Sequence, residues 1–423
     1  MRVLVTGASG FIGSRLVQAL LRAGHRVTAA GRRPVEGCGF IDADFAAVPP
    51  PAFWGPRLAG IDAIVNAVGL LRESGDQTFE ALHLRAPCAL FEAAAQVGVR
   101  RIVQVSALGA DSGARSDYHR SKKAADDFLL GLGTVSATVL QPSLVYGEGG
   151  ASARLFNGMA TLPLIALPGR GDQSVQPVHV DDLVEALVSL VEDPGRLAGE
   201  RLPVVGPEPL TLRGFLGGLR RAMGLRSGRF LPVPLPLVRM AAHLGGALPT
   251  SLLDTATLDM LVRGNTGPAA PLGAVLGRPP RPVSAFVDPT AAAGARALGR
   301  LWWCLPPLRW SVAAVWIVTG LLSLGLYPVQ ESYALLGRFG VSGPWAPWLL
   351  YGAALFDLAL GVAVFALRRR QALWAAQIAL MLSYTALLTW RLPEFWLHPF
   401  GPLLKNLPML AAIGVLWTFE ESR

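Results

Sequence analysis

RVLVTGASGFIG, at residues 2–13, is the stretch of sequence that decides the fold of the first half of the chain. Residues 2–6 have the pattern of a buried strand, and residues 14–23, closed by Gly24, have the spacing of a helix. A glycine-rich turn between a strand and a helix lets the backbone approach a pyrophosphate at the helix N-terminus. The stretch therefore predicts dinucleotide binding by Gly7, Ser9, Gly10, Phe11, Ile12 and Gly13; a turn used only for packing is the alternative.

Strand-like segments recur along the first half at residues 25–30, 63–67, 101–106 and 135–140, with helix-like segments between them. This alternation predicts an α/β fold of the Rossmann type, a doubly wound parallel sheet that binds ligands at the carboxyl ends of its strands. Because residues 1–6 pass directly into the glycine motif, no cleaved signal peptide is indicated, and we expect this half in the cytoplasm.

Two arginines follow the second predicted strand. A site that prefers NAD usually carries an acidic residue about 20 positions beyond the glycine motif, where it binds the ribose 2′-hydroxyl. This chain has Arg32 and Arg33 at that place. Their guanidinium groups can bind the 2′-phosphate of NADP, so we expect NADP, with NAD less favoured. Solvated surface arginines are the alternative.

A serine, a tyrosine and a lysine form the candidate catalytic group. Ser106 ends a predicted strand, and Tyr118 and Lys122 are four residues apart, so they share one face of a helix. A neighbouring ammonium favours the phenolate form of a tyrosine, and a serine hydroxyl can orient a carbonyl or an alcohol beside it. This set would move a proton while a nicotinamide moves a hydride.

The second half of the chain has the composition of a membrane domain. The whole chain is 52% hydrophobic and 16% charged, with a mean hydropathy of +0.42. Four apolar segments follow residue 300, each of about the length that crosses ~30 Å of hydrocarbon as a helix. They predict an all-α four-helix transmembrane domain, with spans at residues 310–330, 345–367, 371–390 and 403–419.

Basic residues orient the predicted spans. Arg300 and Arg309 precede the first span, and residues 368–370 are three arginines between the second and third, which places the N-terminal domain and the C-terminus in the cytoplasm. Glycines and prolines are frequent at residues 264–290, as in an irregular connector. We expect a nucleotide-binding domain at residues 1–263, a linker at 264–307 and a membrane domain at 308–419.

Charge and cysteine content exclude other classes of protein. The net charge of +9 comes from scattered arginines rather than a basic stripe, so no nucleic-acid partner is expected. Cys38, Cys88 and Cys304 have no metal-ligand spacing and are odd in number, so we expect neither a metal site nor a disulfide framework. His179, Asp181 and Asp182 are interpreted as residues at the start of a helix rather than as catalytic groups.

Residues 1–220 resemble the short-chain dehydrogenase/reductase superfamily, in its extended or atypical branch of NAD(P)-dependent epimerases and dehydratases. The resemblance is carried by the glycine motif, Asn66 to Gly69, Ser106, Tyr118 with Lys122, and QPSLVYG at residues 141–147. It implies that Lys122 also binds the nicotinamide ribose. It further implies that adenine lies near Asp44 and Phe45, and that the cofactor is lined by Ala67, Val68, Gly69 and Pro142.

Two further resemblances bear on activity. The run VSALGA at residues 105–110 and QPVHVDD at residues 176–182 are similar to the nucleotide-binding accessory subunit of respiratory complex I, a branch with members that bind NADP without turnover. Residues 308–419 resemble the DoxX-like membrane family, some relatives of which are linked to quinone or thiol redox chemistry. Asp357 lies within the second span, where an ionisable group is costly, and Glu394, His398 and Lys405 are its possible partners.

The sequence thus predicts an oxidoreductase anchored in the inner membrane by several spans. Its substrate would be a hydrophobic carbonyl or alcohol compound from the bilayer. One alternative is a non-catalytic, NADP-binding scaffold or assembly factor with a membrane redox partner. The other is an epimerase or dehydratase that recycles its cofactor.

Overall fold

The structure is a computed structural model that describes residues 1–246, 255–397 and 401–420. The chain divides into two compact units, Met1–Arg300 and Leu301–Arg423, which are described separately.

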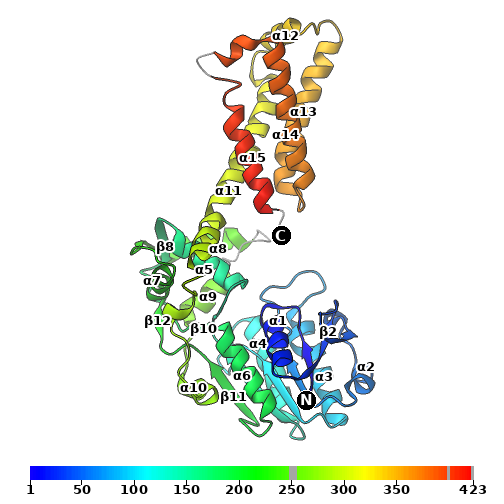
Figure 1. The fold of residues 1–423 in the computed structure, drawn as a ribbon, viewed down its shortest axis with the longest axis vertical. Coiled ribbons are helices and arrows are strands. Elements are labelled where there is room, and N and C mark those ends of the chain that lie inside the picture. The colour runs from blue at the N-terminus through cyan, green and yellow to red at the C-terminus, as the bar shows by residue number, and fades with distance from the viewer. Residues whose placement is uncertain (247–254, 398–400, 421–423) are drawn as a thin grey trace. The chain divides into compact units, whose positions relative to one another are not determined.

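A seven-stranded sheet forms the centre of the first unit (Figure 1). Its spatial order is β3-β2-β1-β4-β5-β6-β11, and each neighbouring pair is parallel. The predicted doubly wound Rossmann-type sheet is therefore confirmed. The strands are β1 (Arg2–Thr6), β2 (Arg26–Gly31), β3 (Gly39–Asp42), β4 (Ala63–Asn66), β5 (Arg101–Val105), β6 (Ser136–Pro142) and β11 (Glu200–Val204).

Strand β1 is apolar throughout its middle because both faces of the sheet are covered. Val3, Leu4 and Val5 are fully buried. Helices α1 (Phe11–Arg22), α6 (Val180–Glu192) and α10 (Ala270–Leu276) bury their apolar side chains against one face. Helices α2 (Pro51–Trp54), α3 (Ala86–Gln96) and α4 (Asp117–Gly131) cover the other face. The strand order reverses between β1 and β4, which is where ligands bind in such sheets.

A smaller subdomain with its own core completes the first unit. Its helices are α5 (Ala151–Thr161), α7 (Leu212–Ala222), α8 (Leu235–Gly246) and α9 (Thr255–Arg263). Its short strands pair two by two: β7 (Val145–Tyr146) with β10 (Val178–His179), β9 (Ser174–Val175) with β12 (Leu210–Thr211), and β8 (Leu164–Pro168) with β13 (Arg229–Val233).

The segment expected to be a linker contains ordered elements. Helix α10 contributes the buried Leu272 and Val275 to the core beneath the sheet, and α11 (Ala292–Leu321) begins within the segment. The domain limits at residues 263 and 307 stay a prediction.

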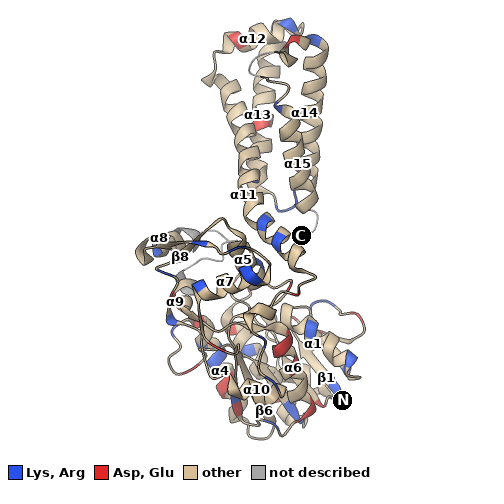
Figure 2. Ribbon diagram, turned by 60° about the vertical axis from the view of Figure 1, so that its left-hand side comes forward, with Lys and Arg blue, Asp and Glu red and all other residues tan. Residues whose placement is uncertain are grey.

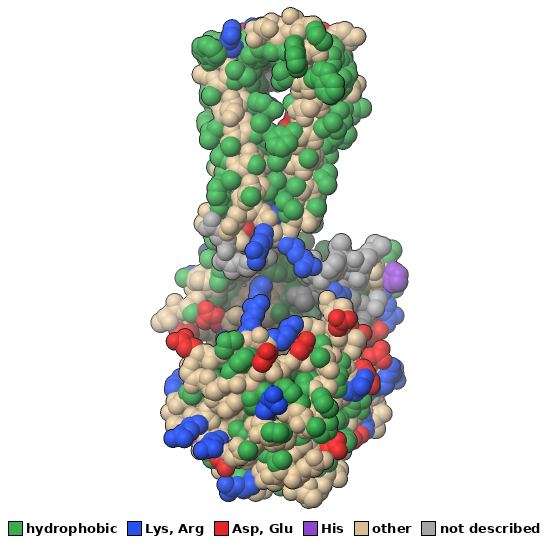
Figure 3. All heavy atoms as spheres, turned by 90° about the vertical axis from the view of Figure 1, so that its right-hand side faces the viewer, with side chains coloured by type: hydrophobic (Ala, Val, Ile, Leu, Met, Phe, Trp, Pro, Cys, Tyr) green, Lys and Arg blue, Asp and Glu red, His purple; other side chains and the backbone are tan. Residues whose placement is uncertain are grey.

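The second unit is helical (Figure 2). It contains most of α11, which continues through a π-helical turn to Leu326, and α12 (Val329–Arg338), α13 (Trp345–Ala366), α14 (Gln371–Arg391) and α15 (Asn406–Glu420). Charged residues are sparse along these helices, and hydrophobic side chains cover the visible face of the bundle (Figure 3).

Three helices of the described residues are long and apolar enough to cross a membrane: Ala292–Leu326, Trp345–Ala366 and Gln371–Arg391. The fourth expected span differs. Residues 402–405 form turns, so α15 begins only at Asn406 and has 15 residues. A helix of this length rises about 22 Å, which is less than the hydrocarbon thickness of ~30 Å.

One end of the bundle is closed by a buried ion cluster. Glu420 of α15 pairs with Arg309 of α11, and with Arg370 just before α14 at 3.7 Å. The indole of Trp374 donates to the same carboxylate at 3.0 Å. The carboxylate side chain is only 11% exposed, and the cluster ties the start of α14 and the end of α15 to the middle of α11.

Asp357 lies in the interior of the bundle, 6% exposed, and within the described residues its Oδ1 has no hydrogen-bond partner. Glu394, one of its expected partners, pairs instead with Arg338 of α12. Lys405 is exposed, and His398 lies outside the described residues.

Candidate functional site

The glycine loop joins β1 to α1 and leaves the start of that helix open. Gly7 has a φ of 66°, and a Cβ there would lie 2.6 Å from the Ala67 carbonyl oxygen. A Cβ on Gly13 would lie 2.1 Å from the Gly7 carbonyl oxygen. Gly10 caps the helix without a side chain, so the N–H groups of its first turn have no side-chain acceptor. This arrangement fits a pyrophosphate, which would accept hydrogen bonds from those groups.

The other loop residues differ in exposure. Ser9 is exposed, and Ile12 packs against the core beside α1. The Phe11 ring lies against the guanidinium of Arg15, whose carbon is 4.7 Å from the ring centroid.

Arg32 and Arg33 follow β2 and are both exposed. With the Gln77 amide oriented so that its oxygen faces Arg32, the guanidinium donates to it at 3.0 Å. Asp44 accepts a hydrogen bond from the Ala46 amide at 3.0 Å, and Phe45 packs on Trp54. These side chains therefore lie at the carboxyl ends of β2 and β3, on the same edge of the sheet as the glycine loop.

A chain of buried hydrogen bonds crosses the carboxyl ends of β1, β4 and β5. The hydroxyl of Thr6 donates to the Asn66 side-chain oxygen, and Asn66 Nδ2 donates to Gln104 at 2.7 Å. Ala67, Val68 and Gly69 follow directly, with Gly69 exposed. This chain sets the spacing of the loops at the point where the strand order reverses.

Helix α4 presents Tyr118 and Lys122 at successive turns. Its N-cap is Ser116, whose hydroxyl accepts from the His119 amide at 3.2 Å. The buried Lys122 Nζ donates to the carbonyls of Val68 at 3.2 Å and Val105 at 3.1 Å. The ammonium therefore joins the loops that follow β4 and β5.

Ser106, at the end of β5, is bonded to a residue that the sequence analysis missed. Its Oγ donates to Asp126 Oδ2 at 2.5 Å. Asp126 is fully buried, and its Oδ1 has no partner within the described part of the chain. Tyr118, Lys122 and Asp126 are spaced four and four along α4, so the helical spacing that singled out the first two also contains the third.

Aromatic rings surround Tyr118. The ring meets those of Phe79 and His83 edge to face, with centroids 5.9 and 5.4 Å apart. His83 belongs to the π-helical turn η3 (Glu80–Arg85); its Nε2 accepts from the Leu70 amide at 3.0 Å. Its Nδ1 therefore carries the proton and donates to Ser121 at 3.1 Å. The imidazole therefore joins the loop that follows Gly69 to helix α4.

Burial controls the electrostatics of the site. It raises the pKa of Tyr118 to about 12, and the charge of Asp126 acts in the same direction. It lowers the pKa of Lys122 and raises the pKa of Asp126, while each favours the charged form of the other. The spacing alone predicted an ammonium that favours the phenolate. In the structure, the ammonium donates to backbone carbonyls, and burial favours the neutral phenol of Tyr118.

His83 makes the stability of this unit sensitive to acid. Burial, and then the charge of Lys122, lowers its pKa to about 3, whereas an unfolded histidine has a pKa of about 6.5. Between these values the unfolded chain binds the extra proton, so we expect the group to cost about 2 kcal/mol of stability between pH 6.5 and 5. Thermal unfolding of wild type and His83→Gln at both pH values measures this loss of stability. An equal loss of stability from pH 6.5 to 5 in the two proteins would contradict the role of His83.

Pro142 ends β6, and its carbonyl accepts from the Leu108 amide at 2.9 Å. The structure thus brings Ser106, Tyr118, Lys122, the loop at Ala67 to Gly69 and Pro142 together at the edge of the sheet where the glycine loop lies. Their expected roles toward a cofactor stay predictions.

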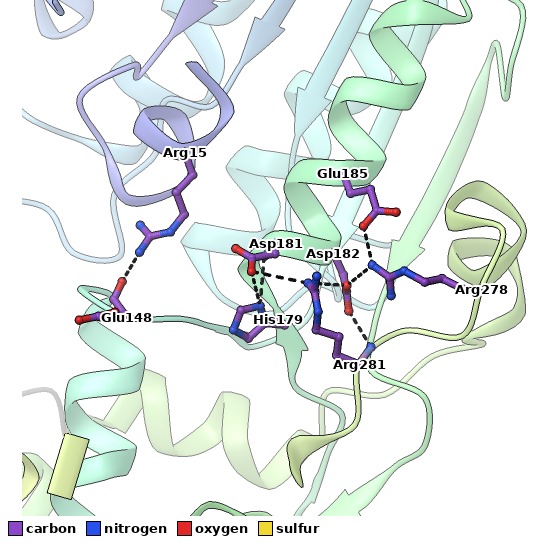
Figure 4. Close-up of polar contacts among 8 residues, drawn as sticks. All are labelled: Arg15, Glu148, His179, Asp181, Asp182, Glu185, Arg278 and Arg281. Atoms are coloured by element: carbon purple, nitrogen blue, oxygen red, sulfur yellow. Dashed lines mark hydrogen bonds and ion pairs between the residues drawn. The ribbon is translucent and has the colours of Figure 1, made fainter. Parts of the chain in front are cut away.

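His179 begins α6 as its N-cap, which confirms its interpretation as a helix-entry residue (Figure 4). Its Nδ1 accepts from the Asp181 amide at 3.3 Å. Asp182 has a larger role, because its fully buried carboxylate accepts from Arg278 and Arg281 at 2.8 Å each. This buried cluster ties residues 278–281 to α6. Of the described residues, no group of three or more His, Cys, Asp or Glu side chains is placed to bind a metal ion.

The geometry agrees with two family matches. Residues 3–206 match the NAD dependent epimerase/dehydratase family, and residues 313–414 match the DoxX-like family. The first half of this chain is an epimerase/dehydratase domain. The DoxX-like domain makes it a membrane protein.

Two curated relatives align with the epimerase/dehydratase domain. One is the mitochondrial NADH dehydrogenase (ubiquinone) 1 alpha subcomplex subunit 9 of Arabidopsis thaliana, 29% identical over 256 residues, with 56% of this chain and 61% of the relative covered. This chain thus spans less than two thirds of that subunit. The other is ceramide reductase of Caulobacter vibrioides, 29% identical over 260 residues, with 60% of this chain and 80% of the relative covered.

A solved structure shares the fold. UDP-glucuronic acid 4-epimerase of Bacillus cereus, in complex with UDP-glucuronic acid and NAD, superposes with a TM-score of 0.52 at 18% identity. The superposition covers 72% of this chain and 100% of the epimerase.

Proposed function

We propose that the protein is a membrane-anchored, NADP-dependent oxidoreductase that interconverts a carbonyl and an alcohol on a hydrophobic substrate. One observation carries the proposal: Tyr118, Lys122 and Ser106 lie at the carboxyl ends of β4 and β5, beside the open N-terminus of α1.

Each residue has a definite task in the reduction direction. A bound nicotinamide supplies the hydride. The phenol of Tyr118, neutral because its pKa is raised to about 12, donates its proton to the carbonyl oxygen as the alcohol forms. Lys122 stabilises the phenolate that remains, until that phenolate takes a proton from water. Ser106 orients the reacting oxygen.

Asp126 acts on this reaction through Ser106 and Lys122 as a positioning residue. Asp126→Asn keeps the acceptor oxygen for Ser106 but removes the charge that favours the protonated form of Lys122. We expect kcat to fall about tenfold and the alkaline limb of the pH profile to move to lower pH. Asp126→Glu, which keeps the charge, should return the alkaline limb of the pH profile to its wild-type position. A pH profile unchanged in Asp126→Asn would contradict this role.

The arginines after β2 support NADP over NAD. Two exposed guanidinium groups with charge-assisted bonds to a 2′-phosphate would contribute about 1 kcal/mol each. We therefore expect Arg32→Ala with Arg33→Ala to weaken NADPH binding about 30-fold and NADH binding less than threefold. Titrations of cofactor fluorescence measure both, with Arg22→Ala as the control for loss of an exposed arginine. Equal weakening of NADPH and NADH binding would rule out a preference for NADP that is set by these arginines.

A hydrophobic substrate is supported by the membrane domain and by the relative named ceramide reductase, whose name specifies a lipid. The chain lies in the inner membrane, with the epimerase/dehydratase domain and the C-terminus on the cytoplasmic side. The ion cluster of Arg309, Arg370 and Glu420 supports this, because it places the start of α14 and the end of α15 at the same end of the bundle. The arginine run at residues 368–370 favours the cytoplasmic side for that end.

A second candidate is a cofactor-binding scaffold for a membrane redox complex. Two contacts favour it. The Ser106 hydroxyl donates a hydrogen bond to Asp126, and the Lys122 ammonium donates to two backbone carbonyls, so both groups have structural partners. The similarity to a complex I subunit points the same way.

Turnover in lipid separates the candidates. We would place the full-length protein in nanodiscs, compare NADPH and NADH binding, and follow NADPH oxidation after adding membrane lipid extract, with empty discs as control. Oxidation with a reduced lipid product supports the oxidoreductase. Tight binding without turnover supports the scaffold. Isomerised product without net oxidation supports an epimerase.

A further inference from the structure

The smaller subdomain of the first unit has an exposed apolar surface formed by β8, β13 and α8. The two strands pair in parallel, with Leu164 opposite Arg229 and Ala166 opposite Leu231. Ile165 and Leu167 point into the core, so the alternate side chains point outward. Leu164 is 49% exposed and Leu231 is 46% exposed.

Helix α8 extends this surface. Its inner side chains, Val238 and Ala242, are buried against Leu258 of α9. Leu237 and Met240, one turn apart on the other side, are 52% and 59% exposed. Helix α8 begins at Leu235, two residues after the end of β13, the strand that pairs with β8. We call Leu164, Leu231, Leu237 and Met240 the docking face.

The segments that form the docking face carry positive charge only, whereas α9, which packs against α8, has the exposed Asp259 as well as Arg263. Residues 149–171 and 209–246, which contain α5, β8, α7, β13 and α8, have no Asp or Glu. Apart from Arg220, which is buried, every arginine in these segments is exposed: Arg154, Arg170, Arg213, Arg221, Arg226, Arg229 and Arg239. Exposed apolar side chains in segments that also present exposed arginines have the composition that binds an anionic lipid surface.

The DoxX-like domain supplies that surface. The first unit ends at Arg300, and the uncharged run of the first span begins at Trp310. This short connection keeps the first unit within reach of the bilayer. Large exposed apolar patches on soluble units mark interaction sites. The bilayer is the partner proposed here, because the membrane domain attaches the first unit to it.

We propose that the docking face inserts into the surface of an anionic bilayer, so that the first unit is held on the membrane by its own side chains as well as by its anchor. The arginines bind lipid phosphates, and the four apolar side chains enter the interface between head groups and acyl chains. Arg263, at the end of α9, pairs with Asp111 in the loop before α4. Docking therefore holds the elements next to the candidate active site at the lipid surface.

Spin labels on the full-length chain test the docking face directly. The three native cysteines are first removed, Cys38 and Cys304 by substitution with serine and Cys88 with alanine. One cysteine for the label is then introduced in each variant, by Leu237→Cys, Met240→Cys or, as a matched control, Val97→Cys. Val97 is 44% exposed at the end of α3. Each labelled protein is placed one copy per nanodisc, in phosphatidylcholine with or without one quarter phosphatidylglycerol. For each spin label, the collision rate with oxygen, which concentrates in lipid, is compared with the collision rate with a water-soluble nickel complex.

Docking predicts that labels at 237 and 240 collide at least threefold more with oxygen than with nickel in discs with phosphatidylglycerol, and that the label at 97 does the opposite. Arg229→Glu with Arg239→Glu should abolish the difference, while circular dichroism shows the fold retained. Labels at 237 and 240 that are as open to nickel as the label at 97 would overturn the proposal. Protection only in discs with two copies would also overturn it, in favour of self-association. These readouts need no cofactor, so they stand or fail separately from the proposed oxidoreductase.

Discussion

Replacing Tyr118 with phenylalanine should lower kcat for the lipid carbonyl by about 10³-fold without weakening NADPH binding. A positioned proton donor contributes about 10²–10⁴ to such a rate, and the substitution keeps the ring while removing the only phenol beside Ser106 and Lys122 in the described site. The ring contacts with Phe79 and His83 would remain, so the fold should be retained. Single-turnover rates with the cofactor already bound measure the loss.

Tyr146→Phe is the matched control. Tyr146 is buried, and its hydroxyl donates to Asn157 of α5 at 2.9 Å rather than to a residue of α4. Its removal should cost about 1 kcal/mol of stability and leave kcat within threefold. If Tyr118→Phe and Tyr146→Phe lose activity equally, the phenol of Tyr118 is not the proton donor. If neither protein turns over any substrate while NADPH binds tightly, the scaffold is favoured.

The second large effect concerns the glycine loop. Gly13→Val should abolish measurable cofactor binding, because even the first carbon of the side chain would lie 2.1 Å from the Gly7 carbonyl oxygen. The start of α1 must then move away from the loop, and the pyrophosphate loses two or more charge-assisted hydrogen bonds. At about 1.5–3 kcal/mol each, that is more than a 100-fold loss of affinity. Isothermal titration with NADPH measures it.

Gly131→Ala is the control for the glycine loop. A side chain at Gly131, near the end of α4, meets nothing within 4 Å. Alanine there should leave the affinity unchanged and stabilise the helix slightly. NADPH binding by Gly13→Val within tenfold of wild type would show that the cofactor does not bind over this loop.

The centre of the sheet was predictable because its strands are buried on both faces. Residues 2–6, 63–67 and 101–106 each contain adjacent Val, Leu or Ile residues, and all became strands within one residue of their expected bounds. The two edge strands were not predicted. The side chains of β3 are largely exposed, and β11 contains Pro203, so neither has a clear buried pattern.

The candidate site was predictable where a local pattern exists. The four-residue spacing of Tyr118 and Lys122 brought both to one helix face. The interaction of Ser106 with Asp126 joins residues 20 positions apart, and that of Asp182 with Arg278 joins residues 96 apart. Such contacts depend on the tertiary fold, which no local spacing contains. The start of the fourth span was placed too early because its apolar composition hides the turns that continue to residue 405.

The ion cluster at the end of the bundle bears on how the protein is made. Glu420 is the carboxylate that Arg309 and Arg370 share, and it leaves the ribosome last of the three. At about 5–20 residues per second, α11 is synthesised some 5–20 s before its partner exists. Arg309 and Arg370 are both made before this carboxylate, so the cluster can form only after α15 has been synthesised. The last contact that joins α11, α14 and α15 at this cluster is therefore timed by the end of translation.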